Sequence, residues 1–323
     1  MRVLLVKLSS LGDVVHTLPA AMDIRRSVPG VQIDWVVEPA FAPLVRLCPV
    51  VDRVIEMDLR RWRKSVLSGQ TRVAWQQFKQ QLQAQSYDRV IDLQGLTKSA
   101  LVSRLARLSP GGKRIAMANR TEGSSYEAPS RWVADRLIEL PPHIHAVDRA
   151  RVVCAQALGY EVPDEFHAGM QLIVQPTAAQ LVVCVHGTSR EDKLWPEAHW
   201  LALGRRLLQS GQVPVFVHGN AAEQDRSQRL SDALPGSQVW PALKLDELTQ
   251  RMAAAQGVIG VDSGVSHIAV ALGLPHVQIY NFDTAWRTGP QHAKQQESVF
   301  AKPCPDVDSV WQAWLLMKQG GAS

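Results

Sequence analysis

Short runs of apolar, largely β-branched residues alternate with longer helical patterns along most of the chain. The apolar runs predict strands at 3–8, 33–37, 53–56, 89–93, 180–186, 213–218, 238–240, 258–261 and 277–280. The helical patterns lie at 13–28, 40–47, 71–86, 96–107, 196–210, 221–233, 245–255 and 264–272. Strands that lack strict polar alternation and are separated by helices favour parallel sheets covered on both faces. The sequence therefore predicts an α/β protein.

This alternation occupies both halves of a chain of 323 residues, a length that suits two domains. We expect two doubly wound domains, at 1–165 and 166–307. The connection is predicted around 160–178, where prolines interrupt the periodicity at VPD 162–164 and QPT 175–177. The segment 109–130 is rich in Gly, Ser, Pro and Arg and predicts either an ordered loop or a mobile flap. Tryptophans at helical spacing in 308–323 predict a helix that docks on the N-terminal domain.

Several classes of protein are excluded by what the sequence lacks. It contains no apolar run of about 18 residues, so no membrane span is expected. The N-terminus lacks the long apolar core and small-residue cleavage site of a signal peptide. The four cysteines are far apart and form no CxxC motif, so neither a zinc site nor a disulfide framework is indicated. We therefore expect a reduced, cytosolic protein.

The basic residues are concentrated in the first half. Residues 1–165 contain 23 Lys and Arg against 17 Asp and Glu, whereas residues 166–323 contain 12 against 13. This asymmetry suggests an anionic partner for the N-terminal domain, although a solvated surface would give the same count. No recognised nucleic-acid-binding module is present, so we do not expect nucleic acid to be that partner.

The first motif is SSLGD at 9–13, directly after the first predicted strand and before a helix. In open α/β domains, ligands bind beyond the carboxyl ends of the strands, so this turn lies where chemistry usually occurs. Asp13 could cap the following helix, as Asp does well, or face a cleft as a functional carboxylate. The two roles are compatible.

Two further turns of this kind follow strands in the second half. In HGTSREDKLWP at 186–196, Thr188 and Ser189 could donate hydrogen bonds to a diphosphate and Lys193 could neutralise it. In GVDSGVSH at 260–267, backbone amides at a helix start would point at an anion. Alternatively, the first turn is a polar surface loop and His267 is a structural hydrogen-bonding residue. No Walker A pattern occurs, which weakens any expectation of ATPase chemistry.

Taken together, these three segments resemble the lipopolysaccharide heptosyltransferases, family 9 of the glycosyltransferases. The resemblance is carried by SSLGDVVHTLPA at 9–20, residues 186–200 and DSGVSH at 262–267, with RRWRK at 60–64 and DLQGLTKS at 92–99 in support. It covers about residues 1–280 and implies a GT-B fold, in which two Rossmann-like domains face each other across a cleft. It also implies an inverting, metal-independent enzyme without a cofactor, which moves L-glycero-D-manno-heptose from ADP-heptose to the first Kdo of Kdo2-lipid A.

The resemblance also implies roles for individual residues. Asp13 would be the catalytic base. The donor would be bound by Thr188, Ser189, Lys193, Glu223, Leu243, Asp262, Ser263, Gly264 and His267. Kdo and the lipid A phosphates are anionic, and the acceptor would be bound by Ser10, Arg60, Arg61, Arg63, Lys64, Lys98 and Arg120. The basic run at 60–64 could also contact the anionic cytoplasmic face of the inner membrane, which implies a peripheral location there.

Two alternatives to this function stay open. A heptosyltransferase that adds the second heptose would share the same motifs, and a product assay with acceptors bearing zero or one heptose separates the two enzymes. A non-catalytic protein that binds sugar nucleotides could share the fold, although the simultaneous presence of Asp13 and a complete diphosphate site argues against it.

Overall fold

The computed structural model describes residues 1–65, 67–170, 172, 180–292 and 294–320. The chain divides into two compact units, Met1–Met170 and Gln171–Ser323. Sequence analysis placed this division at 165/166, within a few residues of the observed one. Of the predicted connection, the segment 175–177 lies outside the described residues.

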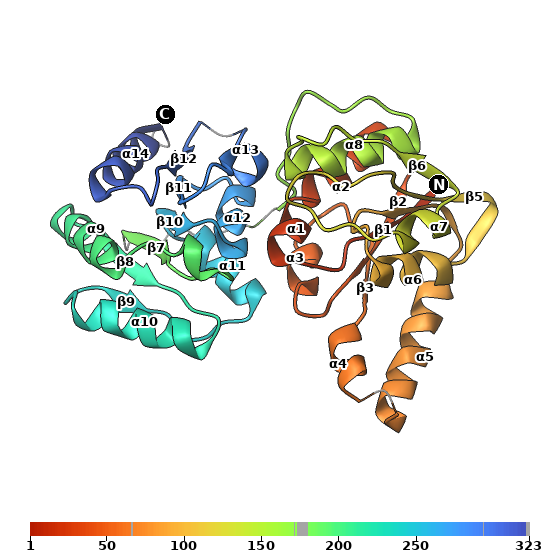
Figure 1. Cartoon of the computed structure of the whole chain (residues 1–323), viewed down its shortest axis with the longest axis horizontal. Helices are drawn as coiled ribbons and strands as arrows, with labels where there is room; N and C mark the ends of the chain where they lie inside the picture. The colour runs from red at the N-terminus through yellow and green to blue at the C-terminus, as the bar shows by residue number, and fades with distance from the viewer. Residues whose placement is uncertain (66, 171, 173–179, 293, 321–323) are drawn as a thin grey trace. The chain divides into compact units, whose positions relative to one another are not determined.

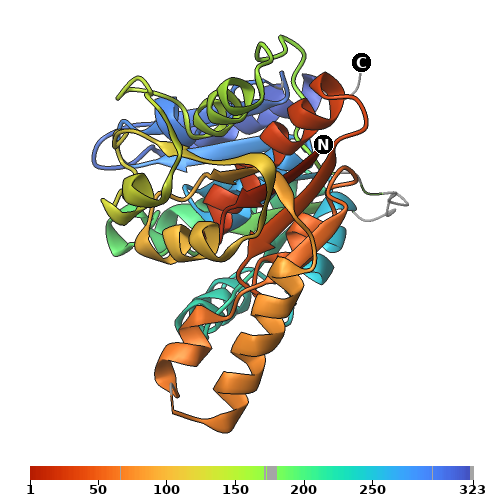
Figure 2. The ribbon, with the colours of Figure 1, turned by 90° about the vertical axis from the view of Figure 1, so that its right-hand side faces the viewer.

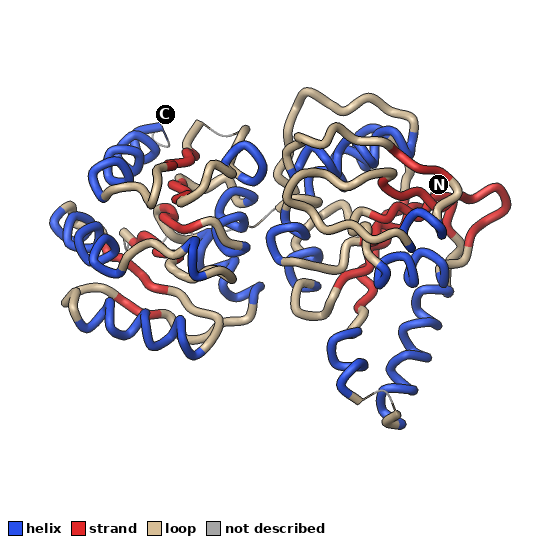
Figure 3. Tube along the Cα trace, in the orientation of Figure 1, coloured by secondary structure: helices blue, strands red, loops and turns tan. Residues whose placement is uncertain are grey.

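The first unit is built on a six-stranded parallel sheet with the order β3-β2-β1-β4-β5-β6. Figures 1 and 3 show this sheet among its helices. Its strands are β1 (Arg2–Val6), β2 (Gln32–Val37), β3 (Arg53–Glu56), β4 (Tyr87–Asp92), β5 (Leu108–Met117) and β6 (Arg136–Ile138). Its helices are α1 (Leu11–Val15), α2 (Leu18–Ser27), α3 (Ala42–Arg46), α4 (Leu59–Lys64), α5 (Gly69–Gln83), α6 (Thr97–Leu105), α7 (Pro129–Val133) and α8 (Ala146–Leu158). This strand order is that of a Rossmann fold, with its topological switch point between β1 and β4.

The second unit repeats the same strand order, as β9-β8-β7-β10-β11-β12. Its strands are β7 (Leu181–Val185), β8 (Val213–Phe216), β9 (Gln238–Val239), β10 (Gly257–Val261), β11 (His276–Tyr280) and β12 (Gln296–Phe300). A 3-10 turn, η1 (Glu191–Lys193), precedes the helices α9 (Glu197–Gln209), α10 (Ala221–Asp232), α11 (Leu245–Ala253), α12 (Gly264–Ala271), α13 (Ala285–Thr288) and α14 (Val307–Gly320). The switch point therefore lies between β7 and β10. The prediction of two doubly wound α/β units is confirmed.

The apolar runs become the centres of the two cores. In the first unit, Leu4 and Val6 face one layer of helices and Val3 and Leu5 face the other, and all four are fully buried. Burial on both faces explains why these strands are apolar throughout rather than alternating. The central strand of the second unit, β10, is likewise buried along its whole length.

The structure differs from the sequence prediction at 109–130 and at 13–28. The segment 109–130, predicted to be a loop or flap, begins with most of the strand β5. The helix predicted at 13–28 is divided into α1 and α2, which are separated by His16 and Thr17. The helix α14 packs on β11, β12 and α9, and its Trp314 is fully buried in the core of the second unit. The apolar face of α14 is thus used within its own unit, and docking of 308–323 on the N-terminal domain stays a prediction.

Within the described parts of the chain, no helix combines the length and apolarity needed to cross a membrane. The four cysteines are free thiols, and three of them are buried.

Candidate active site

Asp13 lies at the switch point of the first unit, just beyond the carboxyl end of β1. The strand ends at Val6, and residues 7–10 lead into α1, where Asp13 occupies the first turn. The backbone N–H and the side-chain hydroxyl of Ser10 donate hydrogen bonds to Asp13 Oδ2, at 3.2 and 2.9 Å. Asp13 therefore does stabilise the helix start, as one interpretation of the sequence proposed.

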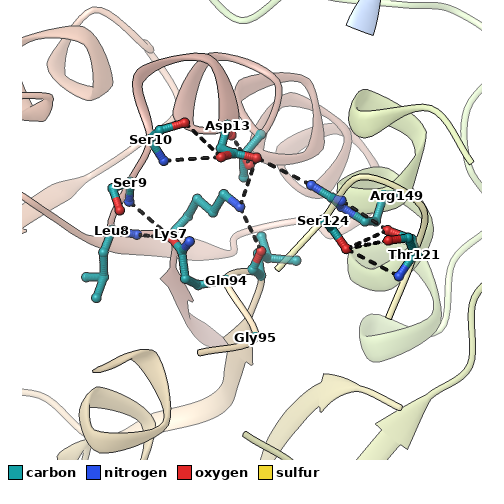
Figure 4. A network of polar contacts seen from close by, with 12 residues as sticks. Lys7, Leu8, Ser9, Ser10, Asp13, Gln94, Gly95, Thr121, Ser124 and Arg149 are labelled. Atoms are coloured by element: carbon teal, nitrogen blue, oxygen red, sulfur yellow. Dashed lines mark hydrogen bonds and ion pairs between the residues drawn. The ribbon is translucent and has the colours of Figure 1, made fainter. Parts of the chain in front are cut away.

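The second oxygen of Asp13 faces two cations (Figure 4). Its Oδ1 lies 3.5 Å from Lys7 Nζ and 3.4 Å from Arg149 Nη2. The carboxylate itself is 35% exposed, whereas the Lys7 side chain is 4% exposed. Burial acts to raise the pKa of Asp13, but the charges of Lys7 and Arg149 and the hydrogen bond from Ser10 outweigh it and hold the pKa well below the usual range. Asp13 is thus an ionised, accessible carboxylate.

Lys7 is the buried member of this group. Its ammonium also donates to the carbonyl oxygen of Leu93, at 3.1 Å. Burial lowers the pKa of Lys7, and the neighbouring Asp13 opposes that shift. Sequence analysis assigned no role to Lys7, which lies within the predicted strand at 3–8. A lysine that directly follows a fully buried strand was the signal that could have identified it.

Arg149 comes from α8, a helix that sequence analysis did not identify. Its Nη1 donates to Thr121 Oγ1 at 3.1 Å, so the arginine bridges Asp13 and the loop after β5 (Figure 4). The pattern was available, because His145 caps α8 and Gly159 ends it in a left-handed conformation, with φ of 78°.

The loop after β4 fixes the turn that carries Asp13. Gln94 Oε1 accepts hydrogen bonds from the backbone N–H groups of Leu8 and Ser9, both at 3.1 Å (Figure 4). The loop is itself held by Asp92, whose buried carboxylate accepts from the backbone amides of Gln94 and Gly95 at 2.9 Å. The motif at 92–99 therefore acts as a support for the turn between β1 and α1.

Glu38 connects this turn to the basic run at 60–64. Its buried carboxylate accepts from Lys98 Nζ at 2.8 Å and is paired with Arg60 Nε at 2.9 Å. Lys98 also donates to Ser9 Oγ, at 2.6 Å. Of the predicted acceptor residues, the structure thus brings Lys98 and Arg60 to a single carboxylate. Sequence analysis missed Glu38 because nothing in its local pattern marks it.

The other predicted acceptor residues lie on the surface of the first unit. Arg61, Arg63 and Lys64 are exposed on α4. Arg120 is exposed in the loop after β5, where its Nε donates to the carbonyl oxygen of Ser124 at 3.0 Å. No contact between Arg120 and the basic run is found among the described residues, so the structure shows a spread of cations and not one cluster.

The second unit gathers polar residues at its own switch point, between β7 and β10. Asp262 follows β10, and its Oδ2 accepts from Lys193 Nζ at 2.6 Å. Its Oδ1 lies 3.5 Å from His267 Nε2, and its backbone oxygen accepts from Thr188 Oγ1 at 3.0 Å. Two sequence motifs that are separated by about 70 residues therefore form one polar group.

The Asp262 carboxylate is almost fully buried, with 6% of the side chain exposed. Burial acts to raise its pKa, but His267 and Lys193 outweigh this effect and hold the pKa well below the usual range. Because Lys193 is already paired with Asp262, a diphosphate at this loop would share its ammonium. The structural role that sequence analysis considered for His267 is also visible, since His267 contacts both Asp262 and Gln278.

The helix α12 begins at this group. Ser263 caps it, with its hydroxyl accepting from the Ser266 backbone N–H at 3.4 Å. Gly260 permits close packing below the turn, because a Cβ there would lie 2.8 Å from Val185 Cβ. The first turn of α12, with Gly264, therefore presents backbone amides beside Lys193, an arrangement suited to an anion.

Glu223 lies at the start of α10, beside the β7 loop. Its Oε2 accepts from the Gly219 backbone N–H at 2.7 Å. A Cβ at Gly187 would lie 2.6 Å from Glu223 Cδ, so a larger residue there would displace the Glu223 side chain from this position. Ser189 is exposed in the loop after β7, and Leu243 is half-buried in the loop before α11. The structure thus places Glu223 and Gly187 together, while Leu243 has no shown contact with them.

Among the residues that the structure describes, no group of three or more His, Cys, Asp or Glu side chains could hold a metal ion. Two parallel six-stranded units of Rossmann order, each with polar residues at its switch point, are the architecture of GT-B glycosyltransferases. The model for glycosyltransferase family 9 (heptosyltransferase) matches residues 75–309. The chain belongs to this family of heptosyltransferases and is therefore a glycosyltransferase.

Similar proteins support this assignment over nearly the full chain. Lipopolysaccharide heptosyltransferase 1 of Pseudomonas aeruginosa is 38% identical over 94% of this chain and 85% of the relative. Lipopolysaccharide heptosyltransferase 2 of Escherichia coli is 25% identical over 87% of this chain and 82% of the relative. The solved E. coli heptosyltransferase WaaC with ADP has a TM-score of 0.86 and 32% identity, covering 99% of this chain and all of WaaC. A second structure of WaaC, with ADP-2-deoxy-2-fluoro heptose, gives 0.82 and 34%, covering 97% of this chain and 98% of that one.

Proposed function

We propose that this enzyme transfers L-glycero-D-manno-heptose from ADP-heptose to the first Kdo of Kdo2-lipid A. The observation that carries the proposal is the state of Asp13, an accessible carboxylate held in its ionised form at the switch point of the first unit. The named relatives support the substrates, because WaaC was solved with ADP and with a fluorinated ADP-heptose. Greater identity to heptosyltransferase 1 than to heptosyltransferase 2 favours addition of the first heptose.

In the proposed reaction, Asp13 removes the proton from the acceptor hydroxyl as its oxygen attacks the anomeric carbon of heptose. The bond from that carbon to the ADP oxygen breaks, ADP leaves with the electron pair, and the anomeric configuration inverts. Because the pKa of Asp13 is low, it is a weak base, and proton transfer is expected late in the reaction, once the attacked carbon has gained positive charge.

We assign the donor to the second unit. The diphosphate would be bound by Lys193, Thr188, Ser189 and the first amides of α12, with Ser263 and Gly264 at the turn. These groups stabilise the negative charge that develops on departing ADP. We therefore propose that turnover survives EDTA. Glu223 and Leu243 would contact the adenosine, Asp262 the heptose hydroxyls, and His267 would position Asp262.

We assign the acceptor to the first unit. Kdo and the phosphates of lipid A are anionic, and the cations of this unit, from Lys98 to the basic run at 60–64, complement them. Ser10, which contacts Asp13, and Arg120, in the loop after β5, would add to this surface. The same cations support a peripheral location on the anionic cytoplasmic face of the inner membrane, because each basic residue near such a surface contributes about 1 kcal/mol.

The test compares Asp13→Asn with Asp148→Asn. Asp148 is a matched control, because it also lies in the first turn of a helix, α8, and its side chain is 39% exposed against 35% for Asp13. Asp13→Asn should bind ADP normally and lose about 10²–10⁴-fold in turnover, the usual contribution of a general base. Asp148→Asn should keep its activity. Near-normal turnover by Asp13→Asn would remove Asp13 as the base.

A heptosyltransferase that adds the second heptose is distinguished by the product. Acceptors that carry zero or one heptose are supplied separately, and the mass of the product is measured. Addition only to the acceptor that already carries heptose would replace the proposed acceptor while leaving the proposed chemistry intact.

A further inference from the structure

The helices α4 and α5 extend away from the sheet of the first unit as a projecting pair (Figures 1 and 2). A cavity of about 600 Å³ lies between them, within the size range of small-molecule sites. Its apolar lining comes from Leu59, Trp62, Leu67 and Trp75, with Arg63 and Arg72 at the same cavity. We call this feature the α4–α5 groove. Of the residues that line the groove, only Arg63 is also one of the proposed acceptor residues.

The aromatic wall of the groove is formed by rings that pack against one another. The rings of Trp62 and Trp75 meet edge to face at 5.5 Å, and Phe78 packs against both, at 5.7 and 5.8 Å. Trp62 and Phe78 belong to the core of the first unit, so the groove is anchored in that core. It is therefore a preformed apolar surface and not a loose loop.

One apolar side chain in the connection between the two helices and one in α5 are exposed to water. Leu67 is 100% exposed, and Val73 in the first turns of α5 is 52% exposed. A fully exposed leucine beside an apolar groove is typical of a surface that becomes covered, because burying such a side chain is favourable by about 1.5–3 kcal/mol.

The charge of the pair indicates what covers it. Residues 58–83 contain six Lys or Arg and a single acidic residue, Asp58. The remaining polar positions of α5 are mainly glutamines, which carry no charge. A helix pair with an apolar face, and with charged side chains that are almost all cationic, fits an anionic bilayer surface, where lysines and arginines meet headgroups and apolar side chains enter the acyl layer.

We propose that the α4–α5 groove docks on anionic phospholipid, with an acyl chain against Trp62, Trp75 and Leu67 and the lipid phosphate at Arg63 and Arg72. The inference rests on the proposed function, because a lipid-linked acceptor requires the enzyme to work at a bilayer. It goes beyond that function by making the contact partly apolar and by assigning it to a groove outside the catalytic residues. The partner is membrane phospholipid and not the acceptor.

The test measures co-sedimentation of the whole protein with vesicles that contain no acceptor. One set contains phosphatidylglycerol and phosphatidylcholine in equal amounts, and the other contains phosphatidylcholine alone. Wild-type protein should bind the first set. Leu67→Asp should bind these vesicles at least tenfold more weakly, because it removes the apolar side chain that would enter the acyl layer. Thr71→Phe, which fills the groove without a change of charge, should weaken binding as well.

The matched control is Leu316→Asp, which replaces an exposed leucine of the second unit and should bind as the wild type does. Arg72→Gln should reduce binding about fivefold, the effect of one surface charge. If Arg72→Gln weakens binding while Leu67→Asp and Thr71→Phe do not, the contact is electrostatic only and the groove proposal fails. Binding that requires added Kdo2-lipid A, or a change of oligomeric state in Leu67→Asp without an effect on vesicles, would also overturn it.

Turnover separates this proposal from the proposed function. With a deacylated, water-soluble acceptor, Leu67→Asp should keep the kcat and KM of the wild type. With an acylated acceptor in anionic vesicles, its rate at low lipid concentration should fall about tenfold. If the wild type has no activity on either acceptor, the proposed function fails while the vesicle result stands. If both acceptors are used equally by wild type and variant, the groove proposal fails and the function stands.

Discussion

Replacing Lys7 with methionine should change the pH dependence of the enzyme more than its fold. Methionine keeps the length and apolar body of the buried side chain but removes a charge 3.5 Å from Asp13 Oδ1. At an effective dielectric constant of about 20, that charge interacts with the carboxylate by about 5 kcal/mol. Solvent at the one-third-exposed carboxylate and the remaining charge of Arg149 reduce the net effect, so we expect the pKa of Asp13 to rise by about one to two units.

The direction of the change in kcat/KM with pH follows from the ionisation of Asp13. In the wild type, the low pKa keeps Asp13 ionised throughout the neutral and mildly acidic range, so its protonation should not produce an acid limb near pH 4. In Lys7→Met, protonation of Asp13 should begin to lower kcat/KM as the pH falls toward that range. The assay is kcat/KM for the acceptor between pH 3.5 and 9, with saturating ADP-heptose and with circular dichroism at each pH to exclude unfolding.

Arg149→Met provides an independent repetition, because Arg149 lies 3.4 Å from the same oxygen. Arg149→Lys keeps the charge and is the control that should show the wild-type dependence of kcat/KM on pH. If kcat/KM of both Lys7→Met and Arg149→Met, as folded proteins, showed no loss at acid pH beyond that of the wild type, the conclusion that these cations set the protonation state of Asp13 would be refuted.

Three further variants test the second unit. Lys193→Met removes the cation assigned to the diphosphate and leaves the buried Asp262 with His267 alone. ADP should therefore bind at least tenfold more weakly in calorimetry. Unchanged affinity would contradict the assigned role of Lys193. Burial lowers the pKa of His186 to about 4. The free energy of unfolding should therefore decrease by up to about 1.4 kcal/mol per pH unit as the pH falls from 6.5 toward 4. Urea unfolding of His186→Gln should show no such decrease. Gly260→Ala should cost about 1–3 kcal/mol, because its methyl group would crowd Val185, and thermal unfolding measures this loss.

The fold could be predicted because its strands are buried on both faces. Runs such as those of β1 and β10 are apolar throughout, which only a covered parallel sheet explains. The strands that sequence analysis missed are the ones without this signature. Much of β5 is exposed and it contains the sequence PGGKR, while β12 is only partly buried. β5 pairs with β4 and β6, and β12 forms the edge of its sheet beside β11; these positions follow from pairing with a neighbour, which no local pattern encodes.

The site was predictable to the extent that it is made of turns that follow strands. Asp262 directly follows β10, and Asp13 and Lys193 lie in the segments that follow β1 and β7, where the rule for open α/β sheets places ligands. The residues that were missed act from elsewhere. Arg149 reaches Asp13 from α8, and Glu38 collects Lys98 and Arg60 from two other segments. Such long-range pairs depend on the fold and leave no trace in sequence spacing.

The central claim is that this heptosyltransferase moves one heptose from ADP-heptose to the first Kdo with inversion. It is tested most directly by incubating the wild-type protein with ADP-heptose and Kdo2-lipid A in the presence of EDTA, followed by mass spectrometry and NMR of the product. We predict release of ADP, the addition of one heptose to Kdo2-lipid A, and a new glycosidic bond with the anomeric configuration opposite to that of the donor. Retention of configuration, strict dependence on a divalent metal, or no transfer to this acceptor would contradict the account.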